Sequence, residues 1–154
     1  MNDFWFAMCL IPNAAAHPDQ YVAKIPLEAM QLLYTAWHEL EPSDKWRSNA
    51  PLTKNGASRG YRATNKNHPL SRWVKRSSGN YELCVDYALE LCTEYTLRFT
   101  KTHDVERNLR WLKSNVPPRL RRRPRTPLML YKPPEWVKPH LKTEQYKKPK
   151  SNTI

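Results

Sequence analysis

Residues 20–41 read QYVAKIPLEAMQLLYTAWHELE and carry the clearest structural pattern of this 154-residue chain. Apolar residues recur there at steps of three and four, which places them on one face of a helix. They are Val22, Ile25, Ala29, Leu33, Ala36 and Leu40. Asp19, which follows His17-Pro18, is expected to cap this helix. Pro26 should kink the helix or mark a new first turn, because proline lacks an N–H donor and clashes with the preceding turn.

The rest of the chain predicts three more helices. A short helix is expected over 69–77, opening at Pro69, then a second long helix over 80–101 and a third over 103–115. A loop over 43–68 separates them from the first helix. One face of the second long helix holds Cys84, Ala88, Leu91 and Tyr95, widened by Leu83, Tyr87 and Phe99.

The predicted fold class is therefore all-α, with three to four helices, long irregular loops and an extended, basic, Pro-rich C-terminal tail. We expect one domain over residues 1–141 and a disordered basic tail over 142–154. Within the Pro-rich part, Thr126 to Tyr131 and Trp136-Val137 are expected to pack back on the body. No window approaches the ~20 apolar residues of a membrane span, so no membrane contact is expected.

Charge is the strongest compositional feature. The chain holds 26 Lys and Arg against 14 Asp and Glu, a net charge of +12. Residues 45–81 contain nine basic residues and no acidic one, and residues 117–154 contain eleven basic and two acidic ones. Such blocks favour a polyanionic partner. The alternative is a solvated basic surface that keeps the protein soluble, which fits the tail better than the acid-free block inside the domain.

The cysteines and histidines give no sign of a metal site. The three cysteines, Cys9, Cys84 and Cys92, form no CxxC pair, and the five histidines are scattered. No metal or cofactor is therefore expected. Cys84 and Cys92 lie in an apolar helical pattern and are expected to be free, buried thiols in a reducing cytoplasm.

Candidate nucleic-acid contacts crowd into residues 60–76, around a predicted helix start whose backbone donors favour an anion. Asn67 and His68 can contact a base or sugar, although a His before Pro more often fixes its own loop. Tyr61 and Trp73 can stack on a base or pack in the core, and core packing is preferred for Trp73. We assign phosphate contacts to Arg62, Lys66, Arg72, Lys75 and Arg76.

A second cationic run lies over residues 119–125, RLRRRPR. Arg121, Arg122 and Arg123 are assigned to a phosphate-binding arm. Each neutralised phosphate would add salt dependence without base information. The alternative for this run is a solvated stretch of charge.

Glu28 is the candidate catalytic residue. At about 100° per residue, it lies at the border of the apolar stripe, where a carboxylate is partly desolvated. Tyr21 shares that side of the helix and Lys24 stands one turn before Glu28; both are assigned to the DNA-binding face. The alternative is an ordinary Lys24–Glu28 pair on a solvated face, which adds only about 0.2–0.5 kcal/mol.

Three short motifs resemble the pyrimidine-dimer DNA glycosylase/AP lyase family known from phage. They are Asp19-Gln20 followed eight residues later by Glu28, the stretch Asn67-His68-Pro69, and Cys92-Thr93-Glu94-Tyr95. The resemblance covers residues 1–115 in outline. The chain departs from the family pattern at Tyr21, where a His is expected, and at Leu27, where a basic residue is expected.

The resemblance implies an N-terminal α-amine, on Met1 or on Asn2 once Met1 is removed, that attacks C1′ of the sugar, expels the base and leaves a Schiff base. Glu28 would steer protons and later help to remove the C2′ proton. The expected function is thus a DNA glycosylase, with or without AP lyase activity, acting on a damaged or modified base. A noncatalytic DNA-binding protein and a phage-type DNA base-modifying enzyme remain as alternatives.

The expected partner is double-stranded DNA. We expect a monomer without cofactors, located in the cytoplasm of a bacterial or phage-infected cell.

Overall fold

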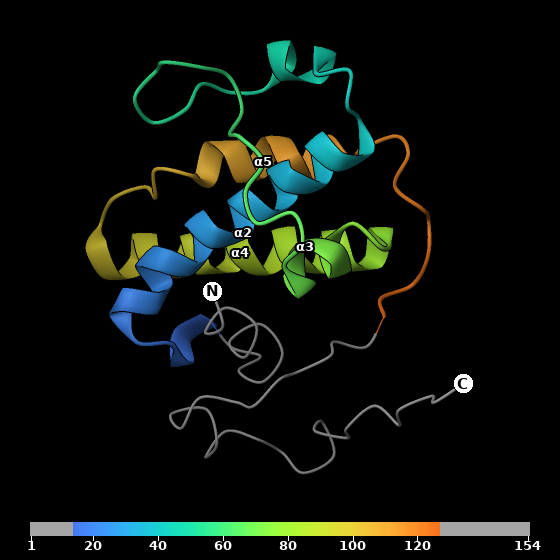
Figure 1. Ribbon diagram of the computed structural model, residues 1–154. Helices are drawn as coiled ribbons and strands as arrows, with labels where there is room; N and C mark the ends of the chain where they lie inside the picture. Colours follow the sequence, from blue (N-terminus) through green and yellow to red (C-terminus); the bar gives the residue numbers. More distant parts are fainter. Residues whose placement is uncertain (1–13, 127–154) are drawn as a thin grey trace.

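The computed structural model describes residues 14–126 of the chain. Within this range the elements are η1 (Ala14–Ala16), α2 (Asp19–Leu40), η2 (Lys45–Asn49), α3 (Pro69–Val74), α4 (Ser78–Phe99) and α5 (Glu106–Ser114), shown in Figure 1. No strand or sheet occurs in residues 14–126, where a single antiparallel bridge joins Leu52 and Arg59. The all-α prediction is confirmed for this part of the chain.

Several predictions concern residues outside this range. They are the amine of Met1 or Asn2, the thiol of Cys9, the packing of residues 127–131 and Trp136-Val137, and the disorder of residues 142–154. All of these stay predictions.

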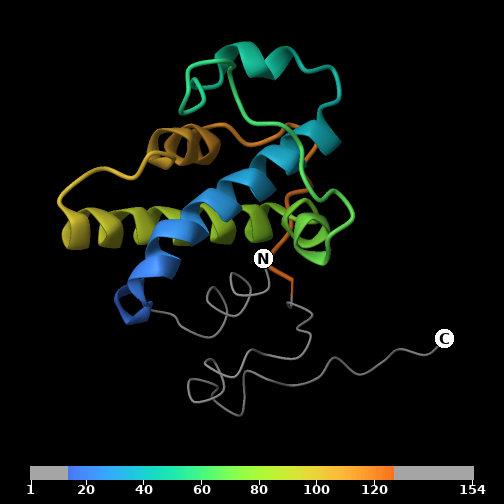
Figure 2. The same ribbon diagram turned by 60° about the vertical axis from the view of Figure 1, so that its left-hand side comes forward.

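Helices α2 and α4 form the centre of the fold, and α3 and α5 each pack against both of them (Figures 1 and 2). The predicted stripe of α2 faces this core. Its buried members are Val22, Ile25, Ala29, Leu33 and Ala36, and Leu40 is half-buried. On α4, the predicted face is also turned inward, with Cys84, Tyr87, Ala88 and Leu91 buried.

Pro26 lies inside α2 and is buried there. The helix runs from Asp19 to Leu40 without a new start, so the expectation of a second first turn at this proline is wrong. A proline in a helix interior costs about 3 kcal/mol. Burial of the stripe on both sides of it, with Ile25 and Ala29 at 1% and 0% exposure, offsets that cost.

Asp19 does not cap α2, contrary to the prediction. It is the first residue of the helix, and the cap position belongs to Pro18, which makes no side-chain cap hydrogen bond. The Asp19 carboxylate instead accepts from Arg98 Nη1 at 2.9 Å. The same guanidinium group donates to the carbonyl oxygens of His17 and Ala15. Arg98 therefore holds the entry to α2 against the end of α4.

The long loop between α2 and α3 is anchored by aromatic side chains. Trp46 of η2 is buried, its indole N–H donates to the Glu41 carbonyl, and its ring lies 5.1 Å from that of Trp37. The rings of Tyr34, Trp46 and Trp111 lie 6.0–6.3 Å from one another, and burial raises the pKa of the Tyr34 hydroxyl. This aromatic cluster fixes the position of the loop over the C-terminal half of α2. The sequence had predicted the loop only as irregular.

The helix boundaries differ modestly from the predicted ones. α3 ends at Val74 rather than residue 77, and α4 begins at Ser78 rather than residue 80, because the Ser77 hydroxyl accepts from the Asn80 N–H and caps α4. α5 begins at Glu106 rather than residue 103. Among residues 14–126, no helix is both long enough and apolar enough to cross a membrane.

Candidate nucleic-acid interface

Glu28 lies at the border between the core and the surface of α2. Its side chain is 13% exposed, and one carboxylate oxygen lies 3.6 Å from Lys24 Nζ. The expected boundary position and the ordinary helical pair are therefore both present. Tyr21, one further turn toward the start of α2, is half-buried against the core.

One face of α2 carries Glu28, Thr35 and Glu39, which are seven and four residues apart. Each spacing is close to a whole number of helical turns, so the three side chains point in similar directions. At about 1.5 Å rise per residue, Glu28 and Glu39 are roughly 16 Å apart along the axis.

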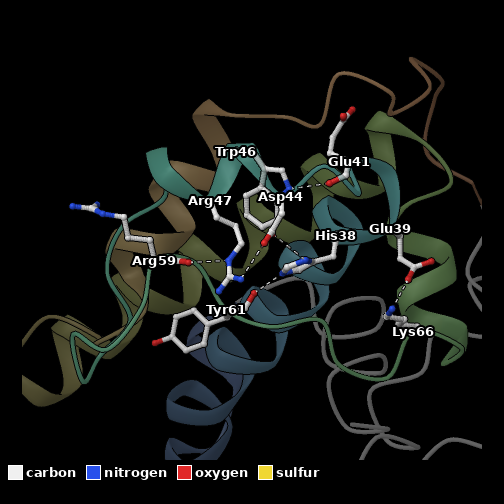
Figure 3. A network of polar contacts seen from close by, with 9 residues as sticks. All are labelled: His38, Glu39, Glu41, Asp44, Trp46, Arg47, Arg59, Tyr61 and Lys66. Carbon is white, nitrogen blue, oxygen red and sulfur yellow. Dashed lines mark hydrogen bonds and ion pairs between the residues drawn. The ribbon is translucent and has the colours of Figure 1, made fainter.

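The segment before α3 crosses α2 at the C-terminal part of this face. The Thr35 hydroxyl accepts from the Thr64 N–H at 3.0 Å, and His38 Nε2 donates to the Tyr61 carbonyl at 2.9 Å. Lys66 Nζ reaches Glu39 at 3.5 Å. Figure 3 shows His38 and Glu39 pointing from α2 toward Tyr61 and Lys66. Tyr61, Thr64 and Lys66 of this segment thus lie directly over α2.

His68 fixes the start of α3. Its Nδ1 accepts from the Leu70 N–H at 3.1 Å, so the ring is the cap of the helix. Partial burial lowers the pKa of His68 below its ordinary 6.5. This is the loop-fixing contact expected for a His before Pro. Trp73 is 4% exposed and belongs to the core, as preferred from the sequence.

After α5 the chain is extended and returns to α4 (Figures 1 and 2). We call residues 119–126 the arginine strap. The Ser78 N–H donates to the Arg121 carbonyl at 2.8 Å, and the Gly79 N–H donates to the Arg123 carbonyl at 3.1 Å. The strap therefore satisfies donors in the first turn of α4, which have no partner inside the helix.

The end of the strap is fastened by Thr126. Its N–H donates to Asn80 Oδ1 at 2.8 Å, its hydroxyl accepts from Asn80 Nδ2 at 2.8 Å, and its carbonyl accepts from Trp73 Nε1 at 3.2 Å. The prediction that the Pro-rich segment packs back on the body is confirmed for Thr126. The side chains of all the strap arginines remain exposed.

The strap and α3 enclose a groove of about 460 Å³, which we call the basic groove. It is lined by Glu39, Leu40, Arg72, Lys75, Arg76, Arg119 and Arg121. Two cationic blocks that are distant in the sequence thus meet at the end of α2. Lys75 Nζ lies 3.3 Å from Glu39, and this carboxylate also pairs with Lys66. The guanidinium groups have no carboxylate partner within the described residues.

A larger hollow of about 830 Å³ lies beside α2, between Gln31 and the loop that carries Tyr61 and Arg62. We call it the Gln31 hollow. Its outer wall is the turn over residues 53–58. Gln31 stands three residues after Glu28, so the hollow opens within about one helical turn of that carboxylate.

The structure groups some of the predicted residues and separates others. Arg72, Lys75, Arg76 and Arg121 line the basic groove, whereas Tyr61 and Arg62 line the Gln31 hollow. The other predicted residues that the structure describes line neither hollow: Tyr21, Lys24, Glu28, Lys66, Asn67, His68, Arg122 and Arg123. Lys66 pairs with Glu39 at the edge of the groove. Met1 and Asn2 lie outside the described residues.

Several lining residues were not assigned to the site from the sequence, among them Gln31, Glu39 and Arg119. Helical spacing from Glu28 is the signal that points to Gln31 and Glu39, which stand three and eleven residues after it. Arg119 belongs to the predicted cationic run.

Among residues 14–126 there is no cluster of His, Cys, Asp and Glu that could hold a metal ion. Comparison of the chain with models of protein families, with curated proteins and with solved structures found no significant match.

Proposed function

We propose that this protein is a DNA glycosylase that holds duplex DNA in the basic groove and uses Glu28 as its catalytic carboxylate. The observation that carries the proposal is the alignment of Glu28 with the groove residue Glu39 on one face of α2, roughly 16 Å apart. At about 3.4 Å per base step, this distance corresponds to about five steps of duplex. A backbone held in the groove thus leaves a nucleotide near Glu28.

The composition of the groove supports binding to phosphates. Arg72, Arg76, Arg119 and Arg121 are exposed there, and arginine donors match the geometry of phosphate oxygens. Glu39 opposes them with a single carboxylate that Lys66 and Lys75 already pair. Contacts of this type position the duplex without reading its sequence.

The half-buried position of Glu28 supports its catalytic role. In the proposed reaction the N-terminal α-amine attacks C1′, and the base departs with the electrons of the glycosidic bond and takes up a proton. The amine nitrogen then loses a proton, and the C1′–O4′ bond of the sugar opens with its electrons and a proton going to O4′, which leaves an imine between the nitrogen and C1′. Loss of the C2′ proton expels the 3′ phosphate and cuts the strand. An α-amine has a pKa of about 7.7–8.0, so a useful fraction is neutral near pH 7.

A noncatalytic DNA-binding protein is the second candidate. It is favoured by the Lys24–Glu28 contact at 3.6 Å, which gives the carboxylate an ordinary structural partner, and by a basic groove that does not include Glu28.

The two candidates are separated by a covalent trap. The full chain is incubated with a duplex that contains one abasic site, and borohydride reduces any imine to a stable cross-link. We expect a cross-link with the native chain and a loss of about 100-fold or more in its rate for Glu28→Gln, the size of effect typical for a proton-transferring group. Duplex affinity should be nearly unchanged, because Glu28 lies outside the groove.

Glu82→Gln is the matched control, because Glu82 is an exposed carboxylate on α4. It should trap and bind as the native chain does. Duplex binding with no cross-link in the native chain would favour the noncatalytic candidate, and equal trapping by Glu28→Gln would remove Glu28 from the mechanism.

A further inference from the structure

We propose that the Gln31 hollow holds a nucleotide turned out of the duplex, with its base beside the Tyr61 ring and its phosphate on Arg62. This inference rests on the proposed function and deepens it, because it names the ligand that lies next to Glu28. The hollow has a volume of about 830 Å³, within the range of about 300–1,000 Å³ that is usual for small-molecule sites.

Hydrogen bonds and an ion pair within the protein hold the walls of the hollow in place. In the outer turn, the Thr53 N–H donates to the Ser58 carbonyl at 2.9 Å, and Asn55 Oδ1 accepts from the Ala57 N–H at 3.1 Å. Lys54 Nζ lies 2.7 Å from Asp104 and ties this turn to the segment before α5. A binding site whose walls are already ordered avoids part of the entropic cost of binding.

The inner wall approaches the aromatic cluster closely. Gly60 has φ +66°, and a Cβ there would lie 3.4 Å from the rings of Trp46 and Tyr34. The next residue, Tyr61, has its ring 5.8 Å from Tyr34, and its hydroxyl accepts from the Lys54 N–H at 3.1 Å. Both ends of the Tyr61 side chain are therefore fixed at the wall of the hollow.

The side chains that face the hollow suit a nucleotide. Tyr61 offers an aromatic ring on which a base can stack. The amide of Gln31 has a donor and an acceptor for the edge of a base. Lys54 is paired by Asp104, whereas Arg62 has no ion pair within the part of the chain that the structure describes. Arg62 is thus the cation that remains for a phosphate.

The position of the hollow favours a nucleotide turned out of a duplex over a free nucleotide as its ligand. Gln31 lies within about one turn of Glu28, and the basic groove lies further along the same helix. A base removed at its glycosidic bond must first leave the duplex, which costs the energy of its pairing and stacking. A stacking ring and a cation beside the catalytic carboxylate offset this cost where the reaction occurs.

The test is a position-specific photocross-link with the full chain. The probe is a short duplex in which a single 5-iodouracil lies opposite an abasic-site analogue, so that the probe base is unpaired and free to turn out. Protein is added until all duplex is bound, and the irradiated complex is digested and mapped by mass spectrometry. We expect the cross-link at Tyr61 or elsewhere within residues 53–64.

The variants are Gln31→Ala and Arg62→Gln, alone and together. At equal occupancy of the duplex, the double variant should lower the cross-link yield by about tenfold or more, as expected for a loss of about 1.4 kcal/mol. Lys101→Gln is the matched control, because Lys101 is an exposed cation that lines neither hollow, and its yield should equal that of the native chain.

A cross-link that maps outside residues 53–64, or a yield that the double variant does not lower, overturns the inference. Duplex binding is measured in the same samples, so this result is distinguished from a loss of the duplex binding on which the proposed glycosylase function depends. Failure of the native chain to bind the duplex at all overturns both.

Discussion

Gly79 is a residue of α4 that the backbone of the arginine strap approaches closely. A Cβ built on Gly79 would lie 2.4 Å from the Arg125 nitrogen and 2.8 Å from the Pro124 carbonyl carbon. Both atoms belong to the backbone, so no side-chain rotation relieves the contact. At this position a larger residue must displace the strap.

We therefore predict that Gly79→Ala loosens the strap. Overpacking of this kind costs about 1–3 kcal/mol, which exceeds the gain of up to about 1 kcal/mol from replacing Gly by Ala in a helix. The free energy of unfolding should fall in urea denaturation. Trypsin should also cleave the native fold faster after Arg119, Arg121 and Arg122, as followed by mass spectrometry.

Gly56→Ala provides the control for this prediction. Gly56 has φ +69°, and no atom lies within 4 Å of the position that a Cβ would take there, so the substitution strains its turn without touching the strap. Its cleavage pattern within the strap should match that of the native chain. A more stable Gly79→Ala variant with unchanged cleavage would contradict the docked position of the strap.

At the scale of single elements, α3 depends on its cap. It has six residues, far fewer than the ~12–15 that an isolated helix needs for even marginal stability. Its start is secured by the neutral form of His68, because only an unprotonated Nδ1 can accept from the Leu70 N–H. The start of this helix therefore responds to pH.

We predict that protonation weakens this cap. The folded state lowers the pKa of His68 below 6.5, mainly through burial of the ring. The stabilising effect of the cap is thus complete above pH 6.5 and is lost as the pH falls below that value, through the pKa of the folded state. Asparagine also caps helices but does not titrate in this range.

The measurement is the free energy of unfolding of the native chain and of His68→Asn between pH 7 and pH 5. The native chain should lose stability relative to the variant as the pH falls. Parallel pH profiles for the two proteins would show that the ring nitrogen of His68 is not the acceptor.

The strap and α3 together make a prediction about salt. Arg76→Gln combined with Arg121→Gln should weaken duplex binding, because each removes one cation from the basic groove. If each contacts one phosphate, the slope of the logarithm of affinity against the logarithm of salt concentration should decrease by about 0.9 per contact. Fluorescence anisotropy with a labelled duplex at several salt concentrations measures both quantities.

Lys101→Gln again serves as the charge-matched comparison, since it removes a cation that does not line the groove. An unchanged slope in the groove variant, or the same loss in Lys101→Gln, would mean that binding depends on net charge rather than on the groove.

At the scale of the whole molecule, the two described cysteines report on the integrity of the core. Cys84 and Cys92 are unpaired and both have 0% exposure. Burial raises the pKa of Cys84, and it raises the pKa of Cys92 to about 12. Neither thiol is therefore reachable or ionised near neutral pH.

We predict that Cys84 and Cys92 resist a thiol reagent such as Ellman's reagent in the native state and react once the core opens. Unfolding in guanidinium should raise the number of reactive thiols by two. Rapid reaction of every cysteine in the native chain would contradict the packing of α4 against α2.

The helices were predictable because their signal is local. The apolar stripe of α2 and the inward face of α4 repeat with the period of a helix, and each stripe buries the other. The fate of Asp19 was not predictable, since its partner Arg98 lies 79 residues away. The continuity of α2 through Pro26 was also hidden, because it depends on burial that only the packed structure supplies.

The candidate site was predictable as residue types but not as a shape. Arg72, Arg76 and Arg121 stand out by charge, yet their meeting in one groove depends on the strap. The strap is held by carbonyl oxygens of Arg121 and Arg123, and every residue type has such a carbonyl. Gln31 was missed because it is uncharged, although its spacing from Glu28 along the helix could be seen in the sequence.

The way the strap is attached also affects how the sequence of this surface can change during evolution. Peptide groups, Thr126 and the buried side chain of Leu120 make the attachment, so the guanidinium groups are exchangeable for other side chains without detaching the segment. Substitution is constrained instead at two uncharged positions of α4, Gly79 and Asn80. The attraction of this surface for anions can thus be retuned by successive substitutions while the architecture beneath it stays the same.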